Sequence, residues 1–414
     1  MVELTIASLG ARGDGIAHDD AGVLYIPYGA PGDHVAATVT GKRGDARLAH
    51  LDTVLHAGPD RVQAPCHHFG SCGGCAMQHL NDRAYSDWKL EILRQALARR
   101  DLGGTVIQAM ITVPTASRRR ARFTALRTRN GLRLGFNEPG SHNIINLTEC
   151  HILRPAIVDL LDRLRALLTD LLAPNKRADV QVTETETGLD LWLAADLPHN
   201  AQTDMRLADF AQDADLARLS TGRRPEVVMV RRAPRVTFTG VAVTPPPDGF
   251  LQASRAGEAA LVRLVQDGVA NAANVADLFA GVGTFSFALA KGTRVTSVEG
   301  AGDQAEALIA ARNAARRSGI EVEVRDLERR ALSVEELSAF DAVIFDPPRV
   351  GAARQVDNLA VSAVPRIVAV SCNPATFARD AATLADAGYH LQSVTPVDQF
   401  PWSRHLELVA VLQR

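Results

Sequence analysis

The last 160 or so residues repeat one pattern, in which a short apolar segment, a turn and a helical stretch follow one another. Apolar segments typical of strands are "NVADLFA", "RVTSVEG", "EVEVRD", "FDAVIFD" and "RIVAVSC". The helical stretches are residues 258–268, "TFSFALAK", "DQAEALIAARNAARRSG" and a segment that starts at Pro374. Strands that alternate with helices form a parallel sheet covered on both faces. The pattern predicts a Rossmann-like, doubly wound α/β domain over 249–414.

The residues before this domain follow two other patterns. Residues 1–58 contain short alternating segments separated by Gly, Pro and Asp, which indicate a small OB-like β-barrel. Residues 59–248 combine a cysteine-rich loop, helical stretches near 85–100 and 155–172, and strands such as "RARFTAL", which predicts an α+β central domain. The run "TPPPDGF" can be neither a helix nor a central strand, so it marks a boundary. We therefore expect three domains.

A glycine loop follows the first strand of the α/β domain. "DLFAGVGTFS" places Gly281 and Gly283 where the strand ends, so that the backbone can turn and approach a ligand. A dinucleotide site has a third glycine, and this loop has Phe285 and Ser286 instead. The spacing favours an S-adenosylmethionine site. Glu299, at the end of the next strand, is then expected to bind ribose hydroxyls, and Asp326, one strand further, the adenine amino group.

Cys372 lies one strand beyond the rigid loop "FDPPR" (345–349), in the setting "VSCNP". It follows a strand and precedes a helix that Pro374 can open. The positive end of a helix dipole lowers the pKa of a nearby thiol, so we expect a reactive cysteine at the ligand-binding edge of the sheet.

A thiolate at this edge suits methylation of uracil C5. Addition of a thiolate at C6 makes C5 nucleophilic toward a sulfonium methyl group, and a base must then remove the C5 proton. "QFPWSRHLELVAVL" offers Glu407 and His405 at alternate positions of an expected strand. Spacing alone leaves Glu407 only slightly ahead of a solvent-facing glutamate.

The blocks "DLFAGVGTFS", "FDPPR", "VSCNPATFARD" and "FPWSRHLE" resemble, in order and over essentially the whole chain, those of the RNA uridine-C5 methyltransferases. The similarity is to the branch with an N-terminal TRAM barrel and a [4Fe–4S] cluster. It implies that Cys372 is the nucleophile and Glu407 the base, and that "GFLQ" places Gln252 at the cofactor. It also implies cofactor-pocket or active-site positions at Phe279, Thr284, Glu299, Asp326 and Asp346.

Cys66, Cys72 and Cys75 lie in "CHHFGSCGGC", and Cys150 follows much later. Three thiolates on a glycine-rich loop and one distant thiolate suit a four-cysteine metal site. The spacing alone does not separate an iron–sulfur cluster from structural zinc, because nearby histidines keep a Cys3His site open: His67, His68, His79 and His151. The resemblance favours the [4Fe–4S] cluster.

The charge distribution is uneven and has two interpretations, a cationic surface for a polyphosphate partner or a solvated helix face followed by a charged strand. The net charge is −2, yet residues 94–133 hold ten arginines, no lysine and one acid, Asp101. Such a local cationic surface fits a polyphosphate partner. The resemblance favours 23S ribosomal RNA, with transfer RNA as the alternative. We expect a cytosolic protein without a membrane span, because no long apolar run or signal peptide is present, and we also expect a monomer.

Three rival functions fit the sequence less well. A catalytically idle RNA-binding protein would lack the nucleophile or the base, and both are present. An RNA cytosine-C5 methyltransferase usually carries a Pro-Cys pair after the fourth strand, where this chain has "DPPR". A radical enzyme would leave an open iron site on three cysteines, and the fourth cysteine argues against it.

Overall fold

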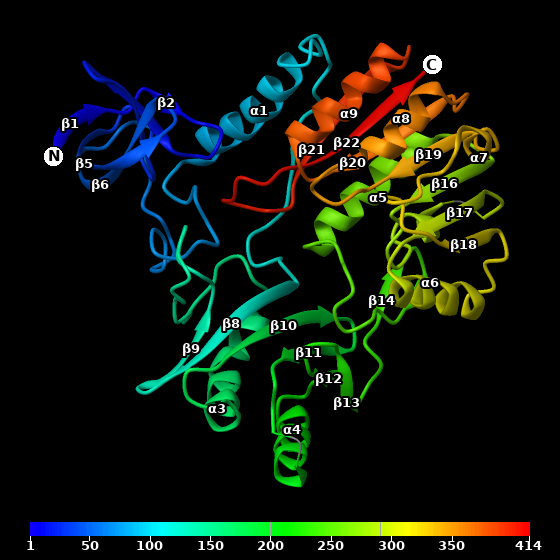
Figure 1. The fold of residues 1–414 in the computed structure, drawn as a ribbon, viewed down its shortest axis with the longest axis horizontal. Coiled ribbons are helices and arrows are strands. Elements are labelled where there is room, and N and C mark those ends of the chain that lie inside the picture. The colour runs from blue at the N-terminus through cyan, green and yellow to red at the C-terminus, as the bar shows by residue number, and fades with distance from the viewer. Residues whose placement is uncertain (199, 290) are drawn as a thin grey trace.

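The computed structural model describes residues 1–198, 200–289 and 291–414. Its elements form three large sheets with helices around them, and the C-terminal sheet is the largest (Figure 1). In the part of the chain that the structure describes, no helix has the length and apolar composition to cross a membrane.

The N-terminal sheet has six strands in the order β1-β5-β6-β4-β3-β2. Their bounds are β1 Val2–Thr5, β2 Ser8–Leu9, β3 Gly15–Asp19, β4 Gly22–Ile26, β5 His34–Arg43 and β6 Ala46–His56. Leu4, Leu24, Ile26 and Val35 form its small core. The strand segments are as predicted, whereas the pairing in the described residues leaves β1 and β2 as outer strands, so closure into a barrel stays a prediction.

The central sheet also has six strands, in the order β13-β12-β11-β10-β8-β9. They are β8 Arg120–Thr128, β9 Gly131–Gly135, β10 Arg177–Thr185, β11 Gly188–Ala194, β12 Arg218–Thr221 and β13 Glu226–Val230. The predicted helix near 155–172 is present as α2 (Pro155–Asp159) and α3 (Leu161–Leu171), and α4 (Ala201–Asp213) follows. The leucines of α3 recur every three or four residues, so one face of the helix is buried against the sheet.

The C-terminal sheet has the order β18-β17-β16-β19-β20-β22-β21-β7. The strands are β7 Ile111–Thr112, β16 Asn274–Leu278, β17 Arg294–Glu299, β18 Ile320–Val324, β19 Ala342–Phe345, β20 Arg366–Ser371, β21 His390–Asp398 and β22 Glu407–Gln413. The strands β18, β17, β16, β19 and β20 pair in parallel, and β22 runs antiparallel to β20. The helices are α5 Arg255–Val269, α6 Gly302–Ala314, α7 Val334–Leu337, α8 Ala353–Val361 and α9 Pro374–Asp386. The doubly wound α/β prediction is confirmed.

One part of this domain differs from the sequence-based expectation. The segment "TFSFALAK" is not an α-helix over its described residues, because only a 3₁₀ turn forms, at Ser286–Ala288. Ser286 is fixed there by a 2.5 Å hydrogen bond from its hydroxyl to the buried carboxyl of Asp277. The segment 244–250, as expected, contains neither helix nor strand between β15 (Val241–Val243), which pairs with β14 (Val236–Phe238), and α5.

The helix α1 (Asp82–Ala98) packs on α9 at the far end of the sheet from β18 (Figure 1). Its residues Leu93, Ala96 and Leu97 belong to the same buried core as the strands of the C-terminal sheet. The short strand β7 extends that sheet by pairing with β21. Residues 82–112 are therefore part of the support of the C-terminal sheet.

Candidate active site

The pairing of two antiparallel strands brings the predicted nucleophile and base together. Ser371, the last residue of β20, pairs with Leu408 in β22. Cys372 directly follows β20 and Glu407 is the first residue of β22, so they adjoin at the same edge of the sheet, and the Glu407 charge acts on the Cys372 thiol. The predicted pair therefore forms from residues 35 positions apart in the printed sequence.

The thiol of Cys372 is half-buried at the start of α9. Burial raises its pKa, and the carboxyls of Glu407 and Asp346 raise it further, whereas Arg349 lowers it through its charge and a hydrogen bond. The prediction of a lowered thiol pKa was therefore wrong, because burial outweighs the favourable position at the helix start. Arg349 is the nearby group that opposes this effect.

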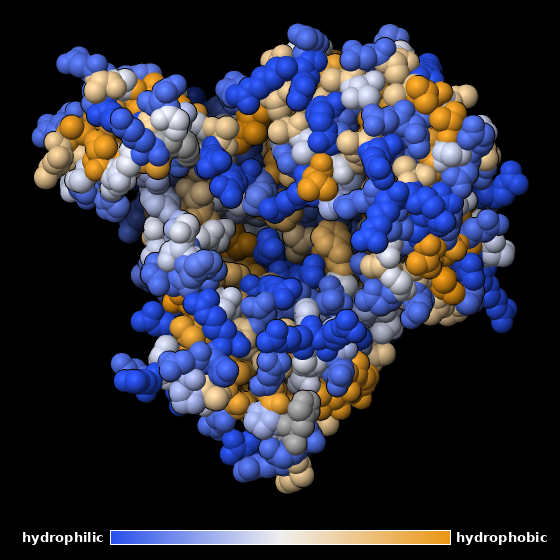
Figure 2. Space-filling view, in the orientation of Figure 1, coloured by the Kyte–Doolittle hydropathy of each residue, from blue (hydrophilic) through white to orange (hydrophobic). Residues whose placement is uncertain are grey.

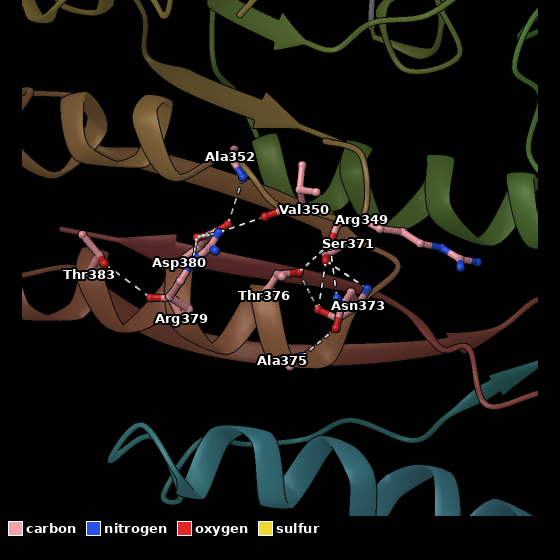
Figure 3. A network of polar contacts seen from close by, with 10 residues as sticks. All are labelled: Arg349, Val350, Ala352, Ser371, Asn373, Ala375, Thr376, Arg379, Asp380 and Thr383. Carbon is pink, nitrogen blue, oxygen red and sulfur yellow. Dashed lines mark hydrogen bonds and ion pairs between the residues drawn. The ribbon is translucent and has the colours of Figure 1, made fainter. Parts of the chain in front are cut away.

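The loop that carries Arg349 is tied to α9 (Figure 3). The backbone carbonyl of Arg349 accepts hydrogen bonds from Asn373 Nδ2 at 3.2 Å and from Thr376 Oγ1 at 3.4 Å. Farther along, Asp380 Oδ2 accepts from the Ala352 N–H at 3.1 Å. The Arg349 side chain extends away from this network, as Figure 3 shows.

Two carboxyl groups adjoin the thiol. Burial raises the pKa of Glu407, which is 3% exposed, to about 7, although a hydrogen bond from Gln399 and the charge of Arg349 oppose the shift. Burial and the neighbouring charges of Glu407 and Asp277 raise the pKa of Asp346 well above its ordinary value. Gln252 Nε2 donates to Asp346 Oδ2 at 3.2 Å. Both acids therefore bind amide donors.

Cys372 opens into a cavity of about 300 Å³. The other lining residues include Arg349, Arg404, His405 and residues of α1. His405 precedes β22 and is not part of the strand, contrary to the expected alternation with Glu407. Burial and four surrounding cations lower the pKa of His405 to about 4, so the imidazole is neutral at pH 7.

The glycine loop lies at the same edge of the sheet, after β16. Gly281 and Gly283 have φ angles of +58° and +94°, and a Cβ at Gly283 would lie 2.7 Å from the Phe287 ring. Phe279 also has a positive φ of +61°, which costs free energy in a residue with a side chain. Thr284 is buried directly after the loop. The turn therefore adopts the conformation that the glycine spacing predicts.

Glu299 is the last residue of β17, and Asp326 follows β18. Glu299 accepts hydrogen bonds of 2.7 Å from the N–H groups of Gly281 and Ala301, so the glycine loop contacts the carboxylate. Asp326 is exposed just after β18, accepts from the Glu328 N–H at 3.0 Å and pairs with Arg329. The predicted cofactor residues thus line neighbouring strand ends of one sheet edge.

Sequence reasoning missed several polar residues of this region. Gln399 bonds to both Gln252 and Glu407, at 2.8 Å and 2.9 Å. Asp277 lies completely buried at the base of the glycine loop, and burial raises its pKa to about 7. Its position in the motif "DLFAGVG" was a usable signal, because an acid inside a buried strand needs partners.

All four N-terminal cysteines line one cavity of about 260 Å³, although they come from 66–75 and 150: Cys66, Cys72, Cys75 and Cys150. Burial raises the pKa of each thiol, and that of Cys75 to about 12. Among the described residues, no three His, Cys, Asp or Glu side chains are close enough together for a single metal ion. The predicted ligands therefore share a cavity but do not form a compact one-ion site.

The four histidines considered for zinc lie differently. His68 and His151 line the cysteine cavity, and His68 Nε2 lies 3.0 Å from Thr148 Oγ1. His67 pairs with Glu149 at 2.8 Å, and His79 is buried against Tyr28 and Phe69.

The predicted arginine-rich surface divides into several environments. Arg119 forms a buried ion pair with Glu258. Arg118, Arg120 and Arg122 lie over the rings of Phe400, Phe250 and Trp192. Parts of the predicted cationic run therefore pack within the protein.

The face in Figure 2 is hollowed at its centre, and hydrophilic side chains gather around the hollow.

Comparisons with known proteins place these features in a family. Residues 248–414 match the family described as tRNA (Uracil-5-)-methyltransferase. An uncharacterized RNA methyltransferase of Rhizobium meliloti is 41% identical, and the alignment covers 99% of both chains. The 23S rRNA (uracil(1939)-C(5))-methyltransferase RlmD of Halomonas elongata is 33% identical over 99% of this chain and 89% of that protein.

The fold also resembles a solved structure. The crystal structure of Pyrococcus abyssi tRNA (uracil-54, C5)-methyltransferase in complex with S-adenosyl-L-homocysteine superposes with a TM-score of 0.76. That superposition covers 99% of this chain and 100% of the other, at 23% sequence identity. It establishes a shared fold.

Proposed function

Because this chain belongs to the family of RNA uracil-C5 methyltransferases, we propose that it methylates C5 of a uridine in RNA through a covalent adduct with Cys372. The observation that carries the adduct is the pairing of β20 with β22, which sets a thiol beside a carboxyl at the ligand-binding edge of the sheet. S-adenosylmethionine supplies the methyl group.

The proposed reaction balances as follows. The Cys372 thiolate forms a bond to C6, and the C5=C6 π pair moves toward C5 and the O4 carbonyl. C5 then attacks the sulfonium methyl group, and the methyl–sulfur bond breaks to leave S-adenosylhomocysteine. Glu407 takes the C5 proton, the C5=C6 double bond forms again, and the bond from C6 to Cys372 breaks.

The charges around the two groups suit these steps. A carboxyl with a pKa of about 7 can accept the C5 proton and release it to water at neutral pH, which supports Glu407 as the base. The free thiol is mainly protonated, because burial and two acids raise its pKa. We propose that Arg349 stabilises the thiolate, since it is the cation that lowers this pKa.

The cofactor pocket is proposed at the shared edge of β16, β17, β18 and β19. The turn at Gly281 and Gly283 brings the backbone to this edge, and Glu299 and Asp326 offer carboxylates to the ribose and the adenine. The remaining proposed contacts are Gln252, Phe279, Thr284 and Asp346. Phe279 lines a cavity of about 180 Å³ beside the loop, which supports its place in the pocket.

We propose that Cys66, Cys72, Cys75 and Cys150 hold a [4Fe–4S] cluster. Four thiols facing one cavity supply the ligand type that such clusters require. Zinc on the same cysteines is the alternative. The cluster would tie the 66–75 loop to residue 150. Iron and acid-labile sulfide analysis of anaerobically purified protein tests this, and zinc without sulfide contradicts it.

We propose 23S ribosomal RNA as the substrate, with transfer RNA as the alternative. The 23S rRNA methyltransferase that is 33% identical to this chain favours ribosomal RNA, and the tRNA methyltransferase of similar fold favours transfer RNA. The proposed division into a TRAM domain (1–58), a central domain (59–248) and a catalytic domain (249–414) gives the RNA two modules besides the catalytic one.

The deciding experiment is tritium release from [5-³H]uridine-labelled RNA that lacks the modification. Wild-type protein and Cys372→Ala are incubated with S-adenosylmethionine, and ribosomal and transfer RNA are assayed separately. Release that requires both the cofactor and Cys372 supports methylation at C5, and the active fraction identifies the substrate. Absence of release from either fraction contradicts the proposed function and favours an RNA-binding protein without activity.

A further inference from the structure

Gln399 is a buried residue of the β21–β22 connection that none of the predicted roles includes. It directly follows β21, eight residues before Glu407, and is 2% exposed. A Cβ at Gly257 would lie 2.8 Å from Gln399 Cβ and 2.9 Å from its Oε1, so α5 presses closely on the side chain. Only a glycine at position 257 leaves space for the Gln399 side chain in this place.

The orientation of the Gln399 amide follows from one contact. Gln399 Oε1 accepts a 3.1 Å hydrogen bond from the backbone N–H of Ala253, and that group can only donate. The NH₂ group must then face the other way, where it donates to Gln252 Oε1 at 2.8 Å and to Glu407 Oε2 at 2.9 Å. All strong hydrogen-bonding atoms of the Gln399 amide are thus used.

The orientation of the Gln399 amide also fixes that of Gln252, which contacts the second acid, Asp346. Because Gln252 Oε1 accepts from Gln399, Gln252 Nε2 faces Asp346 and donates to it at 3.2 Å. Gln399 therefore links the two acids beside Cys372 through one directed chain of hydrogen bonds. An amide N–H donor favours the ionised form of a carboxyl group, and a neighbouring carboxylate disfavours it.

We propose that Gln399 is a positioning residue for removal of the C5 proton: it keeps Glu407 ionised and aimed at the thiol, and couples that base to Gln252. The proposal rests on the proposed function. Asp346, Arg349 and Cys372 also act on Glu407, and these groups remain when Gln399 is replaced.

The proposal separates two steps of the reaction. Formation of the bond between Cys372 and C6 and transfer of the methyl group leave the C5 proton in place. Only the last step, loss of that proton and release of Cys372, needs an ionised Glu407. A protein without the Gln399 amide should therefore still form the methylated adduct but resolve it slowly, so that the adduct accumulates.

The test measures adduct resolution in single turnovers across a range of pH. Gln399→Met keeps the volume and removes the donor, and we expect resolution about tenfold slower at pH 7, with the profile about one pH unit more alkaline. Gln399→Glu keeps the acceptor for Ala253 and adds a negative charge beside Glu407, so its profile should move further. The adduct is quantified as protein-bound RNA on denaturing gels.

A matched control is Gln181→Met. Gln181 is 3% exposed in the central sheet, and its amide bonds to Arg120 and to the Pro247 carbonyl. This variant loses a comparably buried amide, and we expect no adduct to accumulate and no movement of the profile. Accumulation in this control would mean that loss of stability alone slows resolution, which would overturn the proposal.

The remaining outcomes are distinct. In one outcome, wild-type protein forms no adduct, even with RNA that contains 5-fluorouridine, from which a base cannot remove the C5 substituent. This outcome would overturn the proposed function and this inference with it. Wild-type protein that forms and resolves the adduct, beside Gln399 variants with the same rate and profile, overturns the inference alone. Gln399 variants that lose activity without any adduct place its effect before methyl transfer and also overturn it.

Discussion

The charge of Arg349 opposes the burial of the Cys372 thiol, and this balance can be measured without RNA. In Arg349→Met the thiol pKa should rise further, because the cation that lowers it is gone. We expect alkylation of Cys372 by iodoacetamide to be about threefold slower at pH 7 and its pH midpoint to be higher. Peptide mass spectrometry reports this cysteine separately from the others. Arg354→Met, on α8, is the control, and equal rates in both variants would contradict the role of Arg349.

The buried Glu407 carboxyl makes stability depend on pH. Its pKa is about 7 in the folded protein and near 4.5 when unfolded, so between these values the folded state binds more protons. Stability therefore falls as pH rises from about 4.5 to 7. Glu407→Gln removes this dependence, and we expect it to be more stable than wild type by about 2–3 kcal/mol at pH 8 and little different near pH 4.

Denaturant unfolding at several pH values checks this expectation. Glu306→Gln, which removes an exposed carboxyl of α6, serves as the control and should follow the wild type at every pH. A Glu407→Gln protein that is less stable than wild type at pH 8 would mean that burial does not destabilise the ionised carboxyl. This result would contradict the role of Glu407 as a base with a raised pKa.

At the scale of elements, α1 holds the connection between β21 and β22 through a buried charge. Lys89 is fully buried, pairs with Asp398, and donates to the carbonyls of Phe400 at 3.2 Å and His405 at 2.8 Å. Tyr85 donates to the other oxygen of Asp398 at 2.6 Å. These contacts fix both ends of the segment between Gln399 and Glu407.

Lys89→Met should therefore destabilise the protein by about 3–5 kcal/mol, because it leaves the Asp398 carboxyl buried without its cation. Thermal and denaturant unfolding measure the loss, and Lys176→Met, at an exposed lysine, is the control. We also expect lower methyl transfer at temperatures where the variant is still folded. Unchanged stability would mean that the pair contributes nothing to the anchoring of this connection.

The sequence predicts the elements of the C-terminal sheet well because each buried parallel strand is a continuous apolar run next to a helix with its own periodicity. It does not predict that β7 and α1 join this sheet, because a two-residue strand and a helix face have no local signal for a partner almost 300 residues away. The motifs predict Cys372 and Glu407 at one site. Gln399 escapes prediction because one of its partners, Gln252, lies 147 residues earlier.

For the whole molecule, the cysteine cavity joins the loop at 66–75 to residue 150, and both lie outside the C-terminal sheet. Metal binding to such a site stabilises the fold that brings its ligands together. Cys150→Ala should therefore lose bound iron and have a lower melting temperature, whereas Cys372→Ala keeps its iron and loses methyl transfer. Metal analysis and thermal unfolding of the two variants make the comparison. Equal iron in both variants would contradict Cys150 as a ligand.

The ion pair between Lys89 and Asp398 spans 309 residues of chain, and this separation sets an order of events during synthesis. At elongation rates of about 5–20 residues per second, Lys89 is made roughly 15–60 seconds before Asp398. During that interval its amine has no carboxylate to meet and must remain in water, so α1 cannot reach its final buried position. A nascent chain interrupted between Cys372 and Asp398 carries the glycine loop and the thiol but lacks Glu407, and the proposed mechanism predicts that it cannot complete a turnover.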